Sequence, residues 1–314
     1  MKRKPFQKTL RVASYGIWFF TAWLLWPREM DSIFGYRDGL RLVPDYHMVN
    51  ARYVSVKQGK REMEALSHDA NFDFIARKME ADNVTIFTYT DNKKKNKIVG
   101  NHGTFFMDER RFLLKGDVLN ETLGEEIFAK SDTVNYRLND HIAETPSLVE
   151  VWNEDRSLLM WGDRSRADMD ANVMWLYGNA RANFLEPKRG LTKIRGDEAE
   201  LVGAEDRANF YKNVKVEQGE VKGESLEANL YYAATAKSVR FLTLRSDVKI
   251  TEKGGRYTRS QVAEFSAPAD TIVLTGFPSV YDGDDTVSGD KITLYRASTR
   301  SSSASSLIEI CHSR

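Results

Sequence analysis

A short motif recurs along this chain and limits the fold more than any single residue does. Each copy has an apolar stretch, then a residue that tolerates unusual backbone angles, a polar residue, and a small or branched residue. The copies span 112–118, 175–180, 208–214, 242–248 and 272–277. Such β-branched and aromatic stretches suit a pleated, half-buried surface, and internal repetition is the strongest available evidence on the fold. The repeat predicts stacked β-strands, with about one copy in each hairpin.

The Gly and Asn residues of the motif are regularly spaced. The pairs are Gly100 and Gly116 (116 − 100 = 16), Gly162 and Gly178 (178 − 162 = 16), and Gly196 and Asn213 (213 − 196 = 17). The first member of each pair is expected to open a strand, and the second to lie inside the next one. A Gly or Asn inside a strand usually marks a bulge or bend. Bends repeated at one phase would curve the sheet into a trough.

Alternation of side chains across a strand predicts one apolar and one polar face. The apolar face is expected to hold Gly116 and Gly178 together with Leu114, Val118, Leu176, Ala180, Phe210, Val214, Val216, Leu242, Leu244, Val248, Ile250 and Leu274. The polar face is expected to hold Lys115, Asp117, Lys215, Arg245, Asp247 and Lys249. Periodicity alone favours the interpretation that the apolar face is the closed core of a sandwich.

The other segments also indicate an all-β chain after its first helix. Strand-like stretches include 83–90, 103–107 and 199–202, and residues 91–97 have the composition of a solvated turn. Short strands separated by turn residues predict a sandwich, a barrel or a β-solenoid.

The amino terminus has the pattern of a membrane anchor. Basic residues precede the uncharged run 12–26, which contains three tryptophans, and such a charge bias places the amino end in the cytoplasm. The run is short for a span but reaches nearly full length if Arg11 extends its charge to the interface. No small-residue cleavage site follows it, so an uncleaved anchor is favoured over a cleaved signal peptide.

Composition and motifs give no support for catalysis, a metal or a cofactor. The 46 Lys and Arg against 45 Asp and Glu argue against nucleic-acid binding, and the single Cys311 cannot form an internal disulfide. No two histidines stand at metal-ligand spacing. Residues 282–285 resemble a plain turn more than a calcium loop. Asp163, Asp168 and Asp170 are compatible with a glycosidase carboxylate pair, but a solvated face is favoured.

The anchor and the phased motifs together resemble the lipopolysaccharide-export proteins LptC and LptA (OstA-like). The likeness to LptC lies in 50–53, 113–118, 160–163 and 176–180, and the likeness to the LptA repeats lies in 194–199 and the later copies. The predicted organisation is an anchor (1–27), a linker (28–44), an LptC-like jellyroll (45–184), LptA-like repeats (185–297) and a Ser-rich tail without strand pattern (298–314).

The resemblance implies a V-shaped β-jellyroll, open along one side, that holds the lipid A acyl chains of lipopolysaccharide. The twelve apolar residues from Leu114 to Leu274 would then line a lipid groove, and the protein would not be an enzyme. Implied partners are the inner-membrane Lpt ABC transporter complex and LptA- or LptD-type jellyrolls that pair edge to edge. The chain would cross the inner membrane once, with its main domain in the periplasm.

Two other interpretations remain open at this point. A right-handed β-helix that binds or cleaves envelope polysaccharide predicts carboxylates clustered on one outer face. A structural envelope scaffold predicts an apolar interior that is permanently sealed.

Overall fold

The protein is a long antiparallel β-sheet. The computed structural model describes residues 46–124, 126–186, 190–233, 238–267, 269–295 and 307–311. The strands are β1 (Tyr46–Lys57), β2 (Lys60–Asp73), β3 (Lys78–Thr90), β4 (Lys93–Phe106), β5 (Arg111–Thr122), β6 (Ile127–Arg137), β7 (Ile142–Thr145), β8 (Val149–Asn153), β9 (Leu158–Gly162), β10 (Arg164–Asp168), β11 (Val173–Glu186), β12 (Gly190–Val202), β13 (Arg207–Gln218), β14 (Val221–Ala233), β15 (Ser238–Thr251), β16 (Tyr257–Ser266), β17 (Thr271–Thr275), β18 (Ser279–Asp282), β19 (Asp285–Ser288), β20 (Lys291–Tyr295) and β21 (Leu307–Cys311). A single 3-10 turn, η2 (Gly203–Glu205), interrupts the strands in the described part.

The predicted anchor (1–27) and linker (28–44) lie outside the described residues. Within the described part of the chain, no helix is long and apolar enough to cross a membrane.

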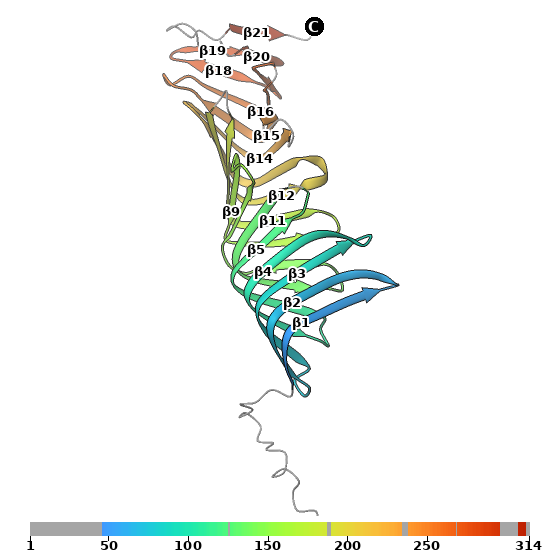
Figure 1. Cartoon of the computed structure of the whole chain (residues 1–314). Coiled ribbons are helices and arrows are strands. Elements are labelled where there is room, and N and C mark those ends of the chain that lie inside the picture. Colours follow the sequence, from blue (N-terminus) through green and yellow to red (C-terminus); the bar gives the residue numbers. More distant parts are fainter. Residues whose placement is uncertain are drawn as a thin grey trace, which may run out of the picture. The chain divides into compact units, whose positions relative to one another are not determined.

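Each long strand pairs with the next one in the chain, and every pairing is antiparallel. In Figure 1 the colours therefore run in sequence order along the sheet. At four places two short strands take the position of one long strand. β7 and β8 both pair with β6, and β9 and β10 both pair with β11. In the same way β17 and β18 both pair with β16, and β20 and β19 then pair with β17 and β18 respectively. A β-helix needs parallel coils, so the β-helix alternative is wrong.

The sheet runs without interruption from the LptC-like segment into the following repeats. β11 pairs with β12 from Val173 to Glu186, apart from the bend described below. The tail 298–314 was expected to lack strands, but it contains β21, which pairs with β20. β1 pairs with β2 alone among the described strands, so its other side is a free edge.

The five copies of the motif share one backbone feature, which is a pair of consecutive residues with positive φ. The pairs are Gly116–Asp117 (77° and 48°), Gly178–Asn179 (72° and 48°), Lys212–Asn213 (62° and 49°), Ser246–Asp247 (65° and 52°) and Gly276–Phe277 (76° and 58°). Gly, Asn and Asp enter this region most readily, which explains why they recur there. At the first four pairs the strand register also shifts, as at a β-bulge.

These pairs bend the strands and divide each one into two halves. We call the strand halves on the side of the sheet that holds the turn at Gln58 and Gly59 the first wall. The halves on the opposite side, which holds the turn at 74–77, form the second wall. In β5, Leu114 pairs with Val134 on the second wall, and Val118 pairs with Ser131 on the first. Gly116 lies at the bend between them. Gly116 and Gly178 are thus bend residues and not members of an apolar face, because the bulge interrupts the alternation there.

Bends inside strands also explain the errors in predicted strand limits. Gly100 and Gly196 lie in the middle of β4 and β12, although each was expected to open a strand. The stretches 103–107 and 199–202 mark only the second halves of these strands. The turn expected over 91–97 is limited to Asp91 and Asn92. Gly and Asn are also typical turn residues. Their presence inside a strand therefore led to the prediction of two strands in place of one.

Candidate functional site

The two walls enclose an apolar interior, and all twelve predicted groove residues are buried in it. Six lie on the second wall: Leu114, Leu176, Phe210, Leu242, Leu244 and Leu274. The other six lie on the first wall: Val118, Ala180, Val214, Val216, Val248 and Ile250. Each motif therefore places one apolar side chain on the second wall before its bend, and all but the last copy place one on the first wall after it. We call the interior between the walls the groove.

Two apolar clusters fill the groove. The first contains Leu114 and Val118 and extends from Met63 to Leu138. The second contains the other ten predicted residues and extends from Val149 to Leu294. The second cluster crosses the boundary at residue 184 between the two predicted jellyroll segments. The apolar interior of the LptA-like segment therefore continues into the last strands of the LptC-like segment, whereas the first cluster is separate.

A cavity of about 60 Å³ lies between the walls in the second cluster. Four of the predicted residues line it: Val216, Leu242, Leu244 and Ile250. Gly223 also lines it, and a Cβ added there would lie 2.9 Å from Leu244 Cδ1. The groove thus has free space where a strand residue on the first wall has no side chain.

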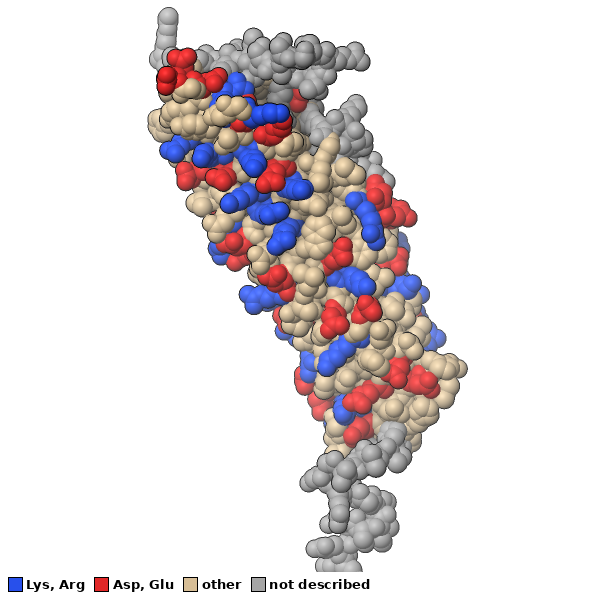
Figure 2. Space-filling model, turned by 90° about the vertical axis from the view of Figure 1, so that its left-hand side faces the viewer, with Lys and Arg blue, Asp and Glu red and all other residues tan. Residues whose placement is uncertain are grey.

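The outer surface of the sheet is polar, as predicted. Lys115, Asp117, Lys215, Arg245, Asp247 and Lys249 are all exposed. Arg181 is paired with Arg195, and Arg195 with Lys215, so three cations lie side by side on the outer face of the first wall. Like charges directly opposite one another are unfavourable, and no ion pair with another described residue offsets them. Figure 2 shows basic side chains gathered over the C-terminal strands.

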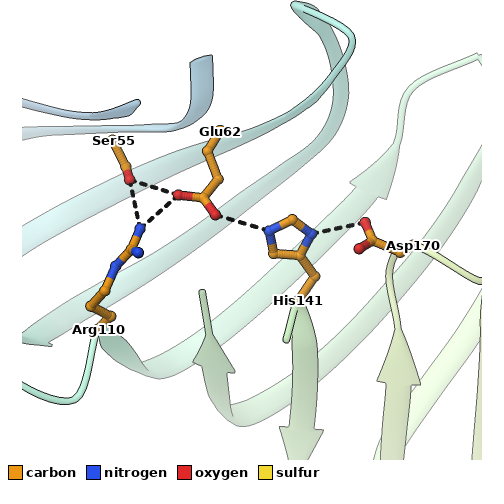
Figure 3. Close-up of polar contacts among 5 residues, drawn as sticks. All are labelled: Ser55, Glu62, Arg110, His141 and Asp170. Atoms are coloured by element: carbon orange, nitrogen blue, oxygen red, sulfur yellow. Dashed lines mark hydrogen bonds and ion pairs between the residues drawn. The ribbon is translucent and has the colours of Figure 1, made fainter. Parts of the chain in front are cut away.

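A network of charged side chains spans the opening of the groove at its N-terminal end (Figure 3). Arg110 Nη2 lies 2.7 Å from Glu62 Oε2, and the Ser55 hydroxyl donates to the same oxygen at 2.8 Å. His141 lies between two carboxylates, with Nε2 3.1 Å from Glu62 Oε1 and Nδ1 2.8 Å from Asp170 Oδ1. We call these five residues the mouth network.

The mouth network joins the two walls. Ser55 and Glu62 belong to β1 and β2 on the first wall, whereas Arg110, His141 and Asp170 lie in turns at the edge of the second wall. Sequence reasoning missed this network, because its members are up to 115 residues apart (170 − 55) and none belongs to the repeated motif. Glu62 is one of several charged residues in its stretch, so nothing in the sequence set it apart.

The mouth network favours the charged forms of Glu62 and His141. Burial alone would raise the pKa of Glu62, but hydrogen bonds from His141 and Ser55 and the charge of Arg110 lower it below its usual range. Burial alone would lower the pKa of His141, but hydrogen bonds to Asp170 and Glu62 raise it. Both shifts in pKa therefore favour an ion pair between Glu62 and His141.

The described residues contain no group of three His, Cys, Asp or Glu side chains that could hold a metal ion. The three aspartates considered for glycoside cleavage each have separate partners. Asp163 accepts a hydrogen bond from Asn179 at 2.8 Å, Asp168 accepts from the backbone N–H groups of Asp170 and Ala171, and Asp170 binds His141. They do not form a carboxylate pair.

Comparison with known proteins relates both halves of the chain to lipopolysaccharide transport. Residues 17–185 match the family described as lipopolysaccharide-assembly, LptC-related. Residues 193–300 match the LptA/(LptD N-terminal domain) LPS transport protein family. Among curated proteins, the sequence search finds no match.

A solved structure of LptH, the LptA-homologous periplasmic component of lipopolysaccharide transport from Pseudomonas aeruginosa, is similar to part of the chain. The identity is 16% and the TM-score 0.31, over 39% of this chain and 95% of LptH. Because the LptC-related match covers more than half of the sequence, the chain belongs to the LptC-related family of lipopolysaccharide-assembly proteins and continues into an LptA-like segment.

Proposed function

We propose that the groove holds the acyl chains of lipopolysaccharide during its transfer from the inner to the outer membrane. The observation that carries this proposal is the apolar interior shared by the LptC-like and LptA-like segments. At about 0.8 kcal/mol for each buried CH₂, a chain of about a dozen carbons contributes up to about 10 kcal/mol. The groove therefore offers a shielded path for a lipid that water would otherwise exclude.

Lipid entry requires the walls to separate. The cavity of about 60 Å³ has room for a few water-sized molecules only. An acyl chain is much larger, so the apolar side chains that now pack across the groove must move apart to contact it. A sealed scaffold, the remaining alternative, would not open.

We further propose that the amino-terminal segment anchors the chain in the inner membrane and that β1 pairs with the transporter complex. The free edge of β1 supports this, since its exposed side chains include Tyr46, Val49, Val54 and Val56. An edge strand with unpaired backbone groups and apolar side chains is a site for strand addition. The LptA-like end would face an LptA- or LptD-type partner.

Photo-crosslinkers test the groove. Placed at Leu176, Phe210 or Leu244, they should capture lipopolysaccharide in cells, because these side chains face the interior. The matched position Lys215 lies on the same sheet but faces outward and should capture none. Equal labelling of both faces, or labelling of neither, would contradict the groove and favour a sealed scaffold.

The same method tests the β1 edge. A crosslinker at Val56, which is 60% exposed, should form adducts with proteins of the inner-membrane complex. Leu226 is a suitable control, since it is also aliphatic and is 53% exposed, but it lies on the interior strand β14. Adducts from both positions would indicate general surface contact and would argue against strand addition.

A further inference from the structure

The mouth network closes the groove with charges, although the groove itself is apolar. We propose that this network is a latch that holds the two walls together at the LptC-like end and opens when lipid enters. The inference rests on the proposed function and adds a control point to it. It is carried by three observations: the way Glu62 is directed inward, the positions of its partners, and the burial of its carboxylate.

A β-bulge directs Glu62 into the mouth. The register between β1 and β2 shifts after Ser55, which pairs with Met63, whereas Val56 pairs with Arg61. Glu62 is the extra residue, and a bulge commonly re-aims a side chain in this way. As a result the Glu62 carboxylate reaches Arg110 and His141 on the second wall. Without the bulge, alternation would place Glu62 on the outer face.

Glu64, which lies on the outer face, shows which partners a carboxylate has there. It lies two residues further along β2, and its side chain is 8% exposed, against 5% for Glu62. Its partners are Arg52, at 2.7 Å, and the Tyr89 hydroxyl, which donates to it at 2.6 Å. Both partners belong to neighbouring strands of the first wall. The two carboxylates are thus similar in burial and pairing, but only Glu62 has bonds that reach the second wall.

The partners on the second wall hold equivalent positions in successive turns. Arg110 and His141 each end a turn with positive φ, at 48° and 53°. The carbonyl of Arg110 accepts the N–H of Leu138 at 3.0 Å, and that of His141 accepts the N–H of Met169 at 3.1 Å. These bonds connect the turns into a continuous edge. Arg110 and His141 are therefore fixed to one body, and separation of the walls would break both contacts with Glu62 at once.

The burial of the Glu62 carboxylate makes the latch depend on its partners, because the Glu62 side chain is 5% exposed whereas those of Arg110 and Asp170 are 36% and 66% exposed. Behind them Phe105 stacks on Phe112 at 4.3 Å between ring centroids, and Tyr53 packs against both. These rings are available to a lipid only after the charges separate. Removing Arg110 or His141 would leave the buried Glu62 charge poorly compensated, so the closed state depends on these two contacts.

Distance measurement between two spin labels tests the latch without any lipid. The labels replace Gln58, in the turn of the first wall, and Asn139, in a turn of the second wall. Both positions are exposed and outside the network, and Cys311 is changed to serine. The variants are Glu62→Gln and, as a matched control with the same loss of charge on the same strand, Glu64→Gln.

We expect Glu62→Gln to shift the distance distribution to longer values, with at least about a tenfold rise in the open population. Glu64→Gln should leave the distribution unchanged. If Glu62→Gln fails to fold, His141→Gln provides the same test from the second wall. Distributions that coincide with that of the unmodified protein, or an equal shift in Glu64→Gln, would overturn the latch.

A lipid-binding measurement separates this result from the proposed function. Crosslinking at Phe210 reports lipid in the groove independently of the labels. Lipid capture with no change in label distance in any variant would refute the latch and leave the function intact. A longer distance in Glu62→Gln without capture would support the latch as a structural device and refute the lipid groove.

Discussion

Replacing Gly223 with leucine should lower lipid capture at Leu244 at least about tenfold, which corresponds to about 1.4 kcal/mol of binding free energy. Gly223 lines the cavity on the first wall, opposite Leu244. An added Cβ would lie 2.9 Å from Leu244 Cδ1 and 3.8 Å from Val216 Cβ. The remaining atoms of the leucine would occupy the space between the walls that an acyl chain needs.

The protein should stay folded, because the close neighbour is the flexible end of a side chain and overpacking typically costs about 1–3 kcal/mol. Thermal unfolding measures this cost, and crosslinking to lipopolysaccharide measures capture. Lys222→Leu is the matched control, since the adjacent side chain faces solvent. Capture by Gly223→Leu at the level of this control would show that lipid does not use this part of the groove.

A second large effect is expected at the bend of β11. Gly178→Ala should lower the free energy of unfolding by about 3 kcal/mol. A non-glycine residue at positive φ costs about 1–2 kcal/mol, and here φ is 72°. The new Cβ would also lie 2.6 Å from Asp163 Oδ2 and 3.1 Å from Asp163 Cβ, so Asp163 would have to move and weaken its hydrogen bond with Asn179.

Gly219→Ala separates the two causes. Gly219 has a φ of 59° but no atom within 4 Å of an added Cβ, so its substitution should cost only about 1–2 kcal/mol. Denaturant unfolding of both variants gives the difference. Equal losses would mean that contact with Asp163 is unimportant and that only the backbone angle demands glycine at position 178.

The residues of the groove could be predicted from the motif because each copy contains both the bend and an apolar residue beside it. Leu176 and Ala180 were placed in the interior from sequence alone, and both are fully buried on opposite walls. The spacing of 16 also has a physical cause. The hairpin brings one bend next to the following one, so Asn179 binds Asp163 and Asn213 binds Asp197, each across 16 residues.

The mouth network could not be predicted in the same way. Its central residue, Glu62, faces inward only because a bulge shifts the register by one residue, and no pattern within β2 shows that shift. Strand limits failed for a related reason. Gly100 and Gly196 were predicted to open strands, but both lie at mid-strand. The reason is that residues suited to a bend are also suited to a turn.

Between β12 and β16 the bulged bends alternate between neighbouring strands. In β13 four positions separate the interior residues Phe210 and Val214 across the bend, whereas in β14 only three separate their partners Ala228 and Ser225. In this part of the sheet a bulged strand lies beside an unbulged one, so the repeating unit is a hairpin. With strands about 4.8 Å apart, each hairpin adds about 10 Å. Under the proposed function, the length of the path that the groove offers a lipid would therefore change in steps of that size, set by the number of hairpins.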